Sequence, residues 1–256
     1  TRAVHTSARR GRRRDRGRRR MLRRALPLAG LAVSTELTRR STAAVDAEIQ
    51  RLYAGVADIH EIPTSEVVEI DASGGHDAYG ELTERGVRAV LKLLAPRPGD
   101  VFVDLGSGAG RMCFQVALEW PEIACSRGVE LSASRHAAGL AALARADAAT
   151  ARRVQLQQAD IIETGAGDAT IGYVASLLFD EKFMARLGAK LDAAPRLRKL
   201  VSLEPFPPGS LTSFERDAAE HPRVEVTWGA AHVYVYSRRT DESPFRTDAI
   251  PCWAQQ

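Results

Sequence analysis

The spacing of hydrophobic residues between positions 42 and 94 predicts two helices. The first covers residues 42–60, where apolar positions fall every three or four residues, as in an amphipathic helix: Val45, Ile49, Leu52, Val56 and Ile59. Ser41 or Thr42 is suited to cap this helix, and Pro63 to end the region. Residues 67–70 favour a short strand or turn, residues 71–80 a glycine-bearing loop, and residues 83–94 the second helix.

Between residues 96 and 203, short apolar runs alternate with longer stretches of helical spacing. The runs predict five strands, over residues 101–105, 127–130, 154–157, 171–175 and 199–203. The stretches between them predict helices over residues 110–119, 132–147 and 180–191. Strands and helices that alternate in this way form a parallel sheet with helices on both faces, so the predicted fold class is α/β.

The last apolar runs have the period of two that is typical of antiparallel strands. Residues 224–228 and 232–236 alternate in this way around Gly229 and predict a hairpin at the sheet edge, which completes a mostly parallel sheet of seven strands. We therefore divide the chain into four parts, over residues 1–41, 42–78, 79–240 and 241–256. They are interpreted as a disordered basic arm or targeting segment, a helical extension with a substrate or cofactor loop, the α/β domain, and a tail.

Positive charge is concentrated at the start of the chain. Residues 1–24 contain twelve arginines and one acid, Asp15, a local charge of +11 that leaves −7 on the rest of a chain whose formal charge is +4. Such an arm would bind polyanions, for example a nucleic-acid backbone, with little sequence preference. If Met21 is the true start, the Arg- and Ser/Thr-bearing segment after it resembles an organellar presequence instead. The nuclear-type arm and the organellar signal both stay open.

Neither a membrane span nor a metal site is expected. No apolar run approaches the roughly 20 residues that a membrane-spanning helix needs. The three cysteines form no CxxC pair, and the six histidines do not cluster with other ligand types at metal spacing.

The strongest chemical signal is a buried strand that runs into Gly106-Ser107-Gly108-Ala109-Gly110 and then into a helix. The glycines allow a sharp turn and close approach to a ligand, and the helix start offers unpaired N–H groups. Asp104 at the strand end can accept a hydrogen bond from a ligand amine or a structural water. Arg111 follows the loop where a phosphate-binding P-loop has lysine, and the GxGxG spacing differs from the GxGxxG of dinucleotide folds. The alternative is a tight turn that binds no ligand.

Two further acids end the next predicted strands. Glu130, 24 residues beyond Gly106, can accept both hydroxyls of a ribose, and Asp160 ends the third strand, where an acid can meet the exocyclic amine of adenine. Either acid alone could be a solvated cap before a helix. Ligands of open parallel sheets bind at the carboxyl edge, so acids at three successive strand ends favour an adenine-bearing ligand.

From about Tyr79 to Thr240 the chain resembles the disruptor-of-telomeric-silencing family of histone lysine methyltransferases, which lack a SET domain. The matching stretches are Tyr79-Gly80-Glu81, residues 100–110 with Gln115-Val116-Ala117, Gly128-Val129-Glu130, Asp160-Ile161, residues 201–208, and the hairpin from Val226 to Tyr236. The resemblance implies a class I (Rossmann-like) methyltransferase fold with S-adenosylmethionine as cofactor. It also implies lysine N-methylation of a nucleosomal histone, in the nucleus.

The resemblance implies roles for individual residues as well. Tyr79 and its loop would close over the methionine part of the cofactor, Glu130 would hold the ribose, and Asp160 with Ile161 would bracket the adenine. The full set expected to bind cofactor is Tyr79, Glu81, Asp104, Gly106, Ser107, Gly108, Gly110, Arg111, Glu130, Leu131, Asp160, Ile161 and Ala175.

The residues expected to be catalytic are Tyr79, Ser176 and Phe179. Tyr79 and Phe179, with Phe206 and Trp228, are expected to line an apolar channel that lowers the pKa of an acceptor amine. Core packing is the alternative for Phe179 and Trp228. For Ser176 the alternative is a cap for the helix that follows.

One stretch departs from the family. The family carries Asn-Asn-Phe-x-Phe after its fourth strand, whereas this chain has Ala175-Ser176-Leu177-Leu178-Phe179, and Arg111 replaces a glutamine. The leading hypothesis is a monomeric protein-lysine methyltransferase that acts on a histone. A non-histone protein or a small molecule is the alternative acceptor, and an inactive relative that binds nucleic acid is the second alternative. A nicotinamide oxidoreductase is a distant fourth.

Overall fold

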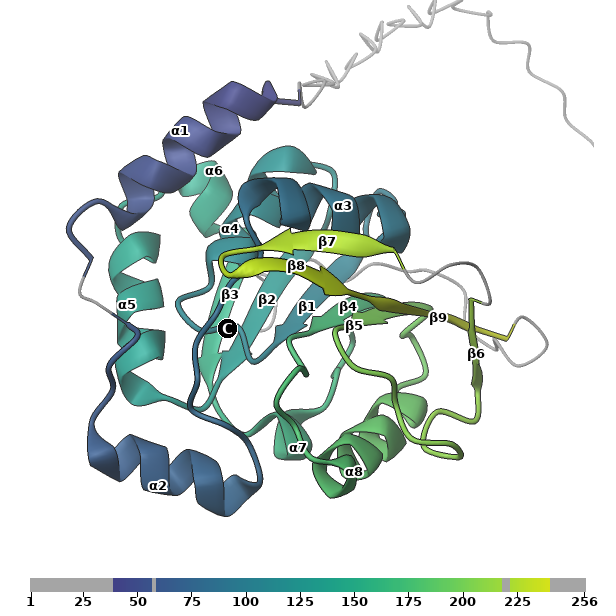
Figure 1. Cartoon of the computed structure of the whole chain (residues 1–256). Helices are drawn as coiled ribbons and strands as arrows, with labels where there is room; N and C mark the ends of the chain where they lie inside the picture. Colours follow the sequence, from purple (N-terminus) through teal and green to yellow (C-terminus); the bar gives the residue numbers. More distant parts are fainter. Residues whose placement is uncertain (1–38, 57–58, 218–221, 240–256) are drawn as a thin grey trace, which may run out of the picture. The chain divides into compact units, whose positions relative to one another are not determined.

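The computed structural model describes residues 39–56, 59–217 and 222–239. Residues 1–38 of the predicted arm, the last residue of the predicted α/β domain and the whole predicted tail lie outside this part. Seven strands form one sheet in the order β3-β2-β1-β4-β5-β9-β6 (Figure 1). The strands are β1 (Val101–Leu105), β2 (Cys125–Glu130), β3 (Val154–Gln158), β4 (Ile171–Val174), β5 (Lys199–Ser202), β6 (Phe214–Arg216) and β9 (Tyr234–Arg238).

The strand order places a reversal at the middle of the sheet. Strands β1 to β5 pair in parallel, whereas β9 is antiparallel to both β5 and β6. The chain runs outward from β1 to β2 and β3, and then returns to β4 and β5 on the other side of β1. In open α/β sheets, ligands bind at the carboxyl ends of the strands beside such a reversal. The mostly parallel seven-stranded sheet predicted from the sequence is confirmed.

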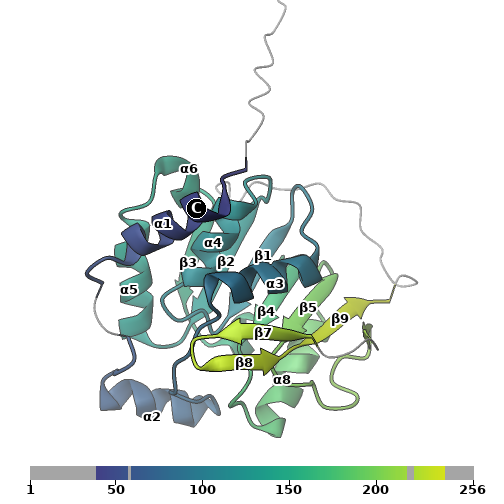
Figure 2. The ribbon, with the colours of Figure 1, turned by 45° about the horizontal axis from the view of Figure 1, so that its top comes forward.

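Helices cover both faces of the sheet, as Figures 1 and 2 show. The helices are α1 (Thr42–Tyr53), α2 (Thr64–Ser73), α3 (Glu84–Leu94), α4 (Arg111–Glu119), α5 (Ala133–Leu143), α6 (Ala148–Ala151), α7 (Ile161–Thr164) and α8 (Glu181–Asp192). Side chains of β1 alternate between two cores: Phe102 packs with residues of α3 and α4, and Val103 with residues of α8. A strand buried on both faces is a near-continuous apolar run, which explains why β1 was predictable.

The segment before β1 differs from its prediction in two places. Helix α1 ends at Tyr53, well before residue 60, and Gly55 beyond it has a φ of +66°, which a helix cannot continue. Residues 67–70 lie in helix α2, so the predicted strand or turn is wrong. Pro63, with φ −54°, stands at the start of α2 and does not end the preceding helix. The predicted loop begins only at Gly74, the left-handed cap of α2.

The helix predicted over residues 132–147 is two helices in the structure. Ser132 caps α5 and Asp147 caps α6, each by accepting a hydrogen bond from a backbone N–H of the first turn. Asp160 caps the short helix α7, which the sequence analysis missed.

The predicted terminal hairpin is also divided. Strand β7 (Arg223–Val226) pairs with β8 (Gly229–His232) as a separate two-stranded ribbon that packs on α3. After Val233, which is fully buried, the same apolar run enters the main sheet as β9. The edge strand on the antiparallel side of the sheet is β6, a strand of three residues that the sequence analysis did not identify. A period of two reports a strand but not its partner, so the division could not be read from spacing.

Candidate active site

Two adjoining cavities lie at the carboxyl edge of the sheet, beside the reversal between β1 and β4. The larger has a volume of about 340 Å³ and the smaller of about 50 Å³, and Tyr79, Gly80, Gly106 and Ala175 line both. Of the residues predicted to bind cofactor, Glu130, Leu131, Asp160 and Ile161 line the larger cavity. Those that line the smaller one are Glu81, Asp104, Ser107, Gly108 and Arg111. Gly110 lines neither, and its role is to start α4.

The glycine loop lets the backbone approach both cavities closely. Gly108 has a φ of +55°, and a Cβ atom there would lie 2.4 Å from the ring of Tyr79. Gly106, with φ +84°, has no atom near the position of a Cβ, so it faces open space in the cavities. Both positions require glycine because of their positive φ angles. Gly108 also leaves room for the ring of Tyr79, and Gly106 leaves the cavities open to a ligand.

Glu130 is held in place by two backbone donors. The N–H of Gly108 donates to its Oε2 and the N–H of Ser132 to its Oε1, each at 2.8 Å. Its side chain is 7% exposed and lines the larger cavity. A carboxylate oxygen has two lone pairs, so each oxygen can accept one more hydrogen bond from a ligand hydroxyl.

Asp160 stands beside the same cavity at the end of β3. The N–H of Ile162 donates to its Oδ1 at 2.7 Å. Its other oxygen has no hydrogen-bond partner within the described ranges. Asp160 is therefore a helix cap, as the alternative proposed, because one of its oxygens caps α7. It also lines the larger cavity, which the alternative did not include.

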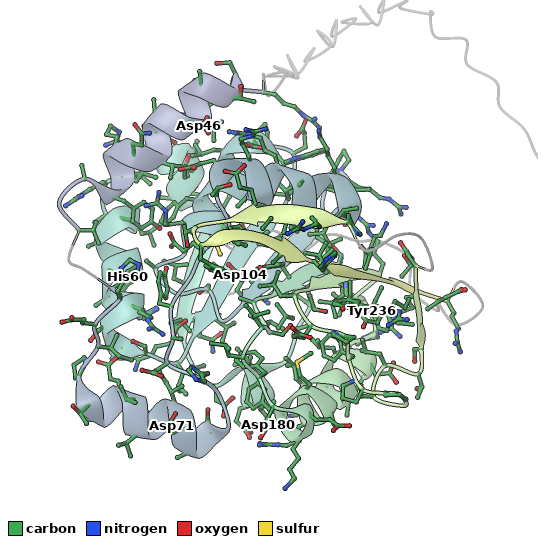
Figure 3. All side chains as sticks on the ribbon, viewed as in Figure 1. Asp46, His60, Asp71, Asp104, Asp180 and Tyr236 are labelled. Atoms are coloured by element: carbon green, nitrogen blue, oxygen red, sulfur yellow. The ribbon has the colours of Figure 1, made fainter. Side chains whose placement is uncertain are left out.

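Asp104 is a buried carboxyl group without a partner on one oxygen. It is 4% exposed, and its Oδ1 has no hydrogen bond among the described residues. Figure 3 shows it near the middle of the sheet. Burial, together with the charges of Glu130 and Glu81, raises the pKa of Asp104 to about 8. A cationic or N–H donor in the smaller cavity would satisfy this oxygen and favour its ionised form.

Tyr79 connects the two cavities. Its hydroxyl donates to Glu81 at 2.5 Å, and Glu81 pairs with Nε of Arg111 at 3.2 Å. Burial and the neighbouring Glu81 charge raise the pKa of Tyr79 well above its usual value, so it stays a neutral donor. Burial also raises the pKa of Glu81, against the lowering effects of Tyr79 and Arg111.

Part of the wall of the larger cavity, here called its apolar end, is made of apolar side chains. It is formed by Ala175, Leu177, Leu178, Phe179, Leu203 and Trp228. Trp228 is 52% exposed, so core packing does not explain it. Its ring lies over Gly80, where a Cβ would come within 1.9 Å of the indole.

Two residues expected at this end are placed elsewhere. Ser176 is fully buried and lines neither cavity, and its hydroxyl accepts a hydrogen bond from the N–H of Glu204 at 2.9 Å. Its other proposed role, the cap of α8, is taken by Asp180. Phe206 is buried against Tyr236, with ring centroids 5.5 Å apart.

Comparison with known proteins shows which family the chain belongs to. The family model "Histone methylation protein DOT1" matches residues 60–226. This range contains all residues that line the two cavities apart from Ile49 and Trp228. The chain belongs to this family. The predicted resemblance is thereby confirmed, and the matched region contains nearly every residue of the predicted site.

One curated relative agrees with the DOT1 assignment, although the matched stretch is short. The chain is 43% identical over 63 residues to a histone-lysine N-methyltransferase, H3 lysine-79 specific, of Aspergillus fumigatus. The match covers 24% of this chain and 12% of that protein, so the chain spans a small part of this relative's length.

Solved structures bear on the fold. Magnesium protoporphyrin IX methyltransferase of Synechocystis PCC 6803, solved with S-adenosylmethionine bound, is 13% identical, with a TM-score of 0.50 over 80% of this chain and 100% of that one. TrmN from Thermus thermophilus is 19% identical, with a TM-score of 0.46 over 60% of this chain and 48% of that one. The first of these two structures, together with the mostly parallel seven-stranded sheet, confirms the predicted class I methyltransferase fold.

The DOT1-type site also contains residues that the sequence analysis missed. Helix α2 contributes Ile70 and Ser73 to the larger cavity, and Arg135 of α5 lies in its wall. Arg135 is only 4% exposed, although it stands in an alanine-rich helix that offered no sign of a buried cation. Tyr173 of β4 lines the smaller cavity, and burial next to Asp104 raises its pKa well above the usual value.

The described part of the chain offers neither a cluster of metal ligands nor a membrane-spanning helix. No group of three or more His, Cys, Asp or Glu side chains there could hold a metal ion. No helix in that part of the chain is long and apolar enough to cross a membrane.

Proposed function

We propose that this DOT1-family protein is an S-adenosylmethionine-dependent protein-lysine N-methyltransferase with a nucleosomal histone as its acceptor. One observation carries the proposal. A single cavity joins the carboxylates of Glu130 and Asp160, at the sheet edge, to the apolar end formed by Phe179 and Trp228. Family membership and the histone methyltransferase relative support the same reaction.

The polar groups of the two cavities fit this cofactor. Glu130 has acceptor capacity for the ribose hydroxyls, and Asp160 has an oxygen for the adenine amine. The unpartnered oxygen of Asp104 fits the ammonium of the methionine part, and Arg111 beside it fits the carboxylate. We also propose that residues 42–78 act as an extension of the domain at 79–240, since α2 forms part of the cavity wall.

When bound, the cofactor supplies an electrophilic methyl group, and the protein's task is to present a neutral amine in line with it. Neutralising a lysine at pH 7.4 costs about 4 kcal/mol, given an ordinary pKa near 10.4. Leu177, Phe179 and Trp228 remove water from the amine, which lowers its pKa and offsets part of this cost. Tyr79, which packs against Gly108 between the two cavities, excludes water from the cofactor side.

A polyanionic partner is part of the proposal. Helix α8, which begins beside Phe179, presents Lys182, Arg186 and Lys190 at successive four-residue intervals, so they share one exposed face. None of the three has an ion-pair partner among the described residues. If half of the twelve arginines in residues 1–24 also contact phosphates, the log–log slope of nucleosome affinity against salt is about −5 or steeper. A slope near zero would contradict this role and the nuclear location that goes with it.

A non-histone acceptor is the second candidate. The stretch that departs from the family contributes only Ala175, Leu177, Leu178 and Phe179 to the cavity, because the hydroxyl of Ser176 is bound to the backbone of Glu204. No side chain of this stretch can therefore hold the acceptor nitrogen by a hydrogen bond. The apolar end of the cavity would therefore select acceptors by their apolar shape more than by the chemical identity of their amine.

The test is methyl transfer from labelled S-adenosylmethionine to nucleosomes, free histones and cell extract. Labelled histone in the nucleosome sample supports the leading proposal, and label only in the extract supports the second candidate. Glu130→Ala should abolish transfer, and Glu215→Ala, an exposed acid on β6, should not. Absence of transfer to every acceptor, combined with nucleic-acid binding, would replace the enzyme with an inactive relative.

A further inference from the structure

Residues 59–79 form one wall of the larger cavity although few of their side chains are buried. Ile70, Ser73, Gly75, His76 and Tyr79 of this segment line the cavity. Helix α2 lies within the segment and buries Ile70 alone. Apolar packing therefore holds this wall weakly, and its position must depend on polar contacts.

Arg135 of α5 supplies such contacts at both ends of the segment. Its Nε donates to the carbonyl oxygen of Ile59 at 3.3 Å, and its Nη2 donates to the carbonyl oxygen of Asp77 at 2.5 Å. The same guanidinium lies 4.8 Å from the ring centroid of Tyr79. His60, labelled beside α5 in Figure 3, packs its ring edge-on against Tyr79 at 5.4 Å. One side chain thus touches the start, the end and the key aromatic residue of the segment.

Glu66 fastens the middle of the segment to the start of the same helix. Its carboxylate accepts hydrogen bonds from the hydroxyl of Ser132 at 2.5 Å and from the hydroxyl of Ser134 at 2.6 Å. The N–H of Ser132 donates to Glu130. Glu130, the residue proposed to bind the ribose, and the wall formed by residues 59–79 are therefore both anchored at the start of α5.

We propose that Arg135 is a positioning residue that closes residues 59–79 over the cofactor, so that Tyr79 stays against Gly108. The inference rests on the proposed function, because the cofactor is the ligand that the closed wall would retain. Arginine suits the task since its planar fork can donate in two directions while its face stacks on a ring. A lysine ammonium can reach one carbonyl but cannot reproduce the fork or the stacking.

The experiment compares Arg135→Gln and Arg135→Lys with the unaltered protein. We expect the Kd and KM for S-adenosylmethionine to rise at least tenfold in Arg135→Gln and by a smaller factor in Arg135→Lys. The value of kcat at saturating cofactor should stay within about threefold, because Arg135 acts on the wall and not on the acceptor. Amide hydrogen exchange of the free protein should become faster across residues 59–79 and stay unchanged in β1.

A matched control is available at the other end of α5. Arg145, just beyond α5, donates to the carbonyl oxygens of Leu52 at 3.0 Å and Ala54 at 2.5 Å, and it lines neither cavity. Arg145→Gln removes the same kind of double contact and should leave the Kd for the cofactor unchanged.

The outcomes separate the inference from the proposed function. Unchanged Kd and unchanged exchange over residues 59–79 in Arg135→Gln would overturn the inference, as would a fall in kcat with no change in Kd. If Arg135→Gln does not fold, Arg135→Lys decides by the same measurements. If the unaltered protein binds no S-adenosylmethionine, the proposed function fails, and the exchange comparison still tests whether Arg135 holds the wall.

Discussion

Replacing Asp104 with asparagine should make the free protein more stable at neutral and alkaline pH, although it removes a residue of the proposed site. The folded protein raises the pKa of Asp104 to about 8, whereas the ordinary value, which the unfolded chain restores, is near 3.8. The folded state therefore binds more protons than the unfolded state between these two values. The contribution of protonated Asp104 to the free energy of unfolding is therefore fully present below about pH 4 and is lost as the pH rises toward 8.

The magnitude follows from the size of the shift. Each pKa unit corresponds to about 1.4 kcal/mol, so the loss reaches about 5 kcal/mol by pH 8. Asparagine carries no charge at any pH, so the free energy of unfolding of Asp104→Asn does not fall in this way as the pH rises. Its buried amide, in a place where one Asp104 oxygen already lacks a partner, costs about 1–3 kcal/mol. Asp104→Asn should thus gain roughly 2–4 kcal/mol at pH 8 and gain nothing near pH 4.

Urea unfolding of the ligand-free protein at several pH values between 5 and 8 measures this difference. The matched control is Asp100→Asn, because Asp100 is also buried but accepts hydrogen bonds from Arg97, Thr170 and Arg198. That substitution should destabilise the protein at every pH. If Asp104→Asn behaves like Asp100→Asn at pH 8, Asp104 is an ionised and partnered group, and the reasoning is refuted. Cofactor titration should show weaker binding by Asp104→Asn, opposite in sign to its effect on stability.

Other substitutions test the remaining parts of the site. Gly108→Ala places a Cβ 2.4 Å from Tyr79 and should weaken cofactor binding more than tenfold, whereas Gly209→Ala, with φ +84° and no atom within 4 Å, carries only the backbone strain. Equal cofactor Kd values for these two variants, measured by titration, would contradict the close packing of Tyr79 on the loop. Trp228→Ala should lower kcat/KM for the acceptor severalfold without changing the Kd for the cofactor, because the indole lies over Gly80 at the apolar end. A loss of cofactor affinity in this variant would move Trp228 to the cofactor side.

The carboxyl edge of the sheet shows how far local sequence patterns reach. The buried run before Gly106 is a strand, Glu130 ends the second strand as predicted, and Asp160 comes two residues after the third. These features are readable because a strand buried on both faces needs consecutive apolar residues, and the topology of parallel sheets brings strand ends together. The sequence alone thus determined the parallel strands β1 to β5 and the acids of the proposed cofactor site, whereas strand β6, the division of the terminal hairpin and helices α2 and α7 could not be read from it.

Tertiary structure decided what depends on contacts between distant segments. Whether residues 67–70 form a helix, whether Ser176 faces the cavity and whether Arg135 is buried are settled by neighbours that lie tens of residues away. The same holds for the oxygen of Asp104 that lacks a hydrogen-bond partner among the described residues. Spacing along a chain reports which face a side chain shares with its near neighbours. Its partners and its exposure to water are set only when remote segments pack around it.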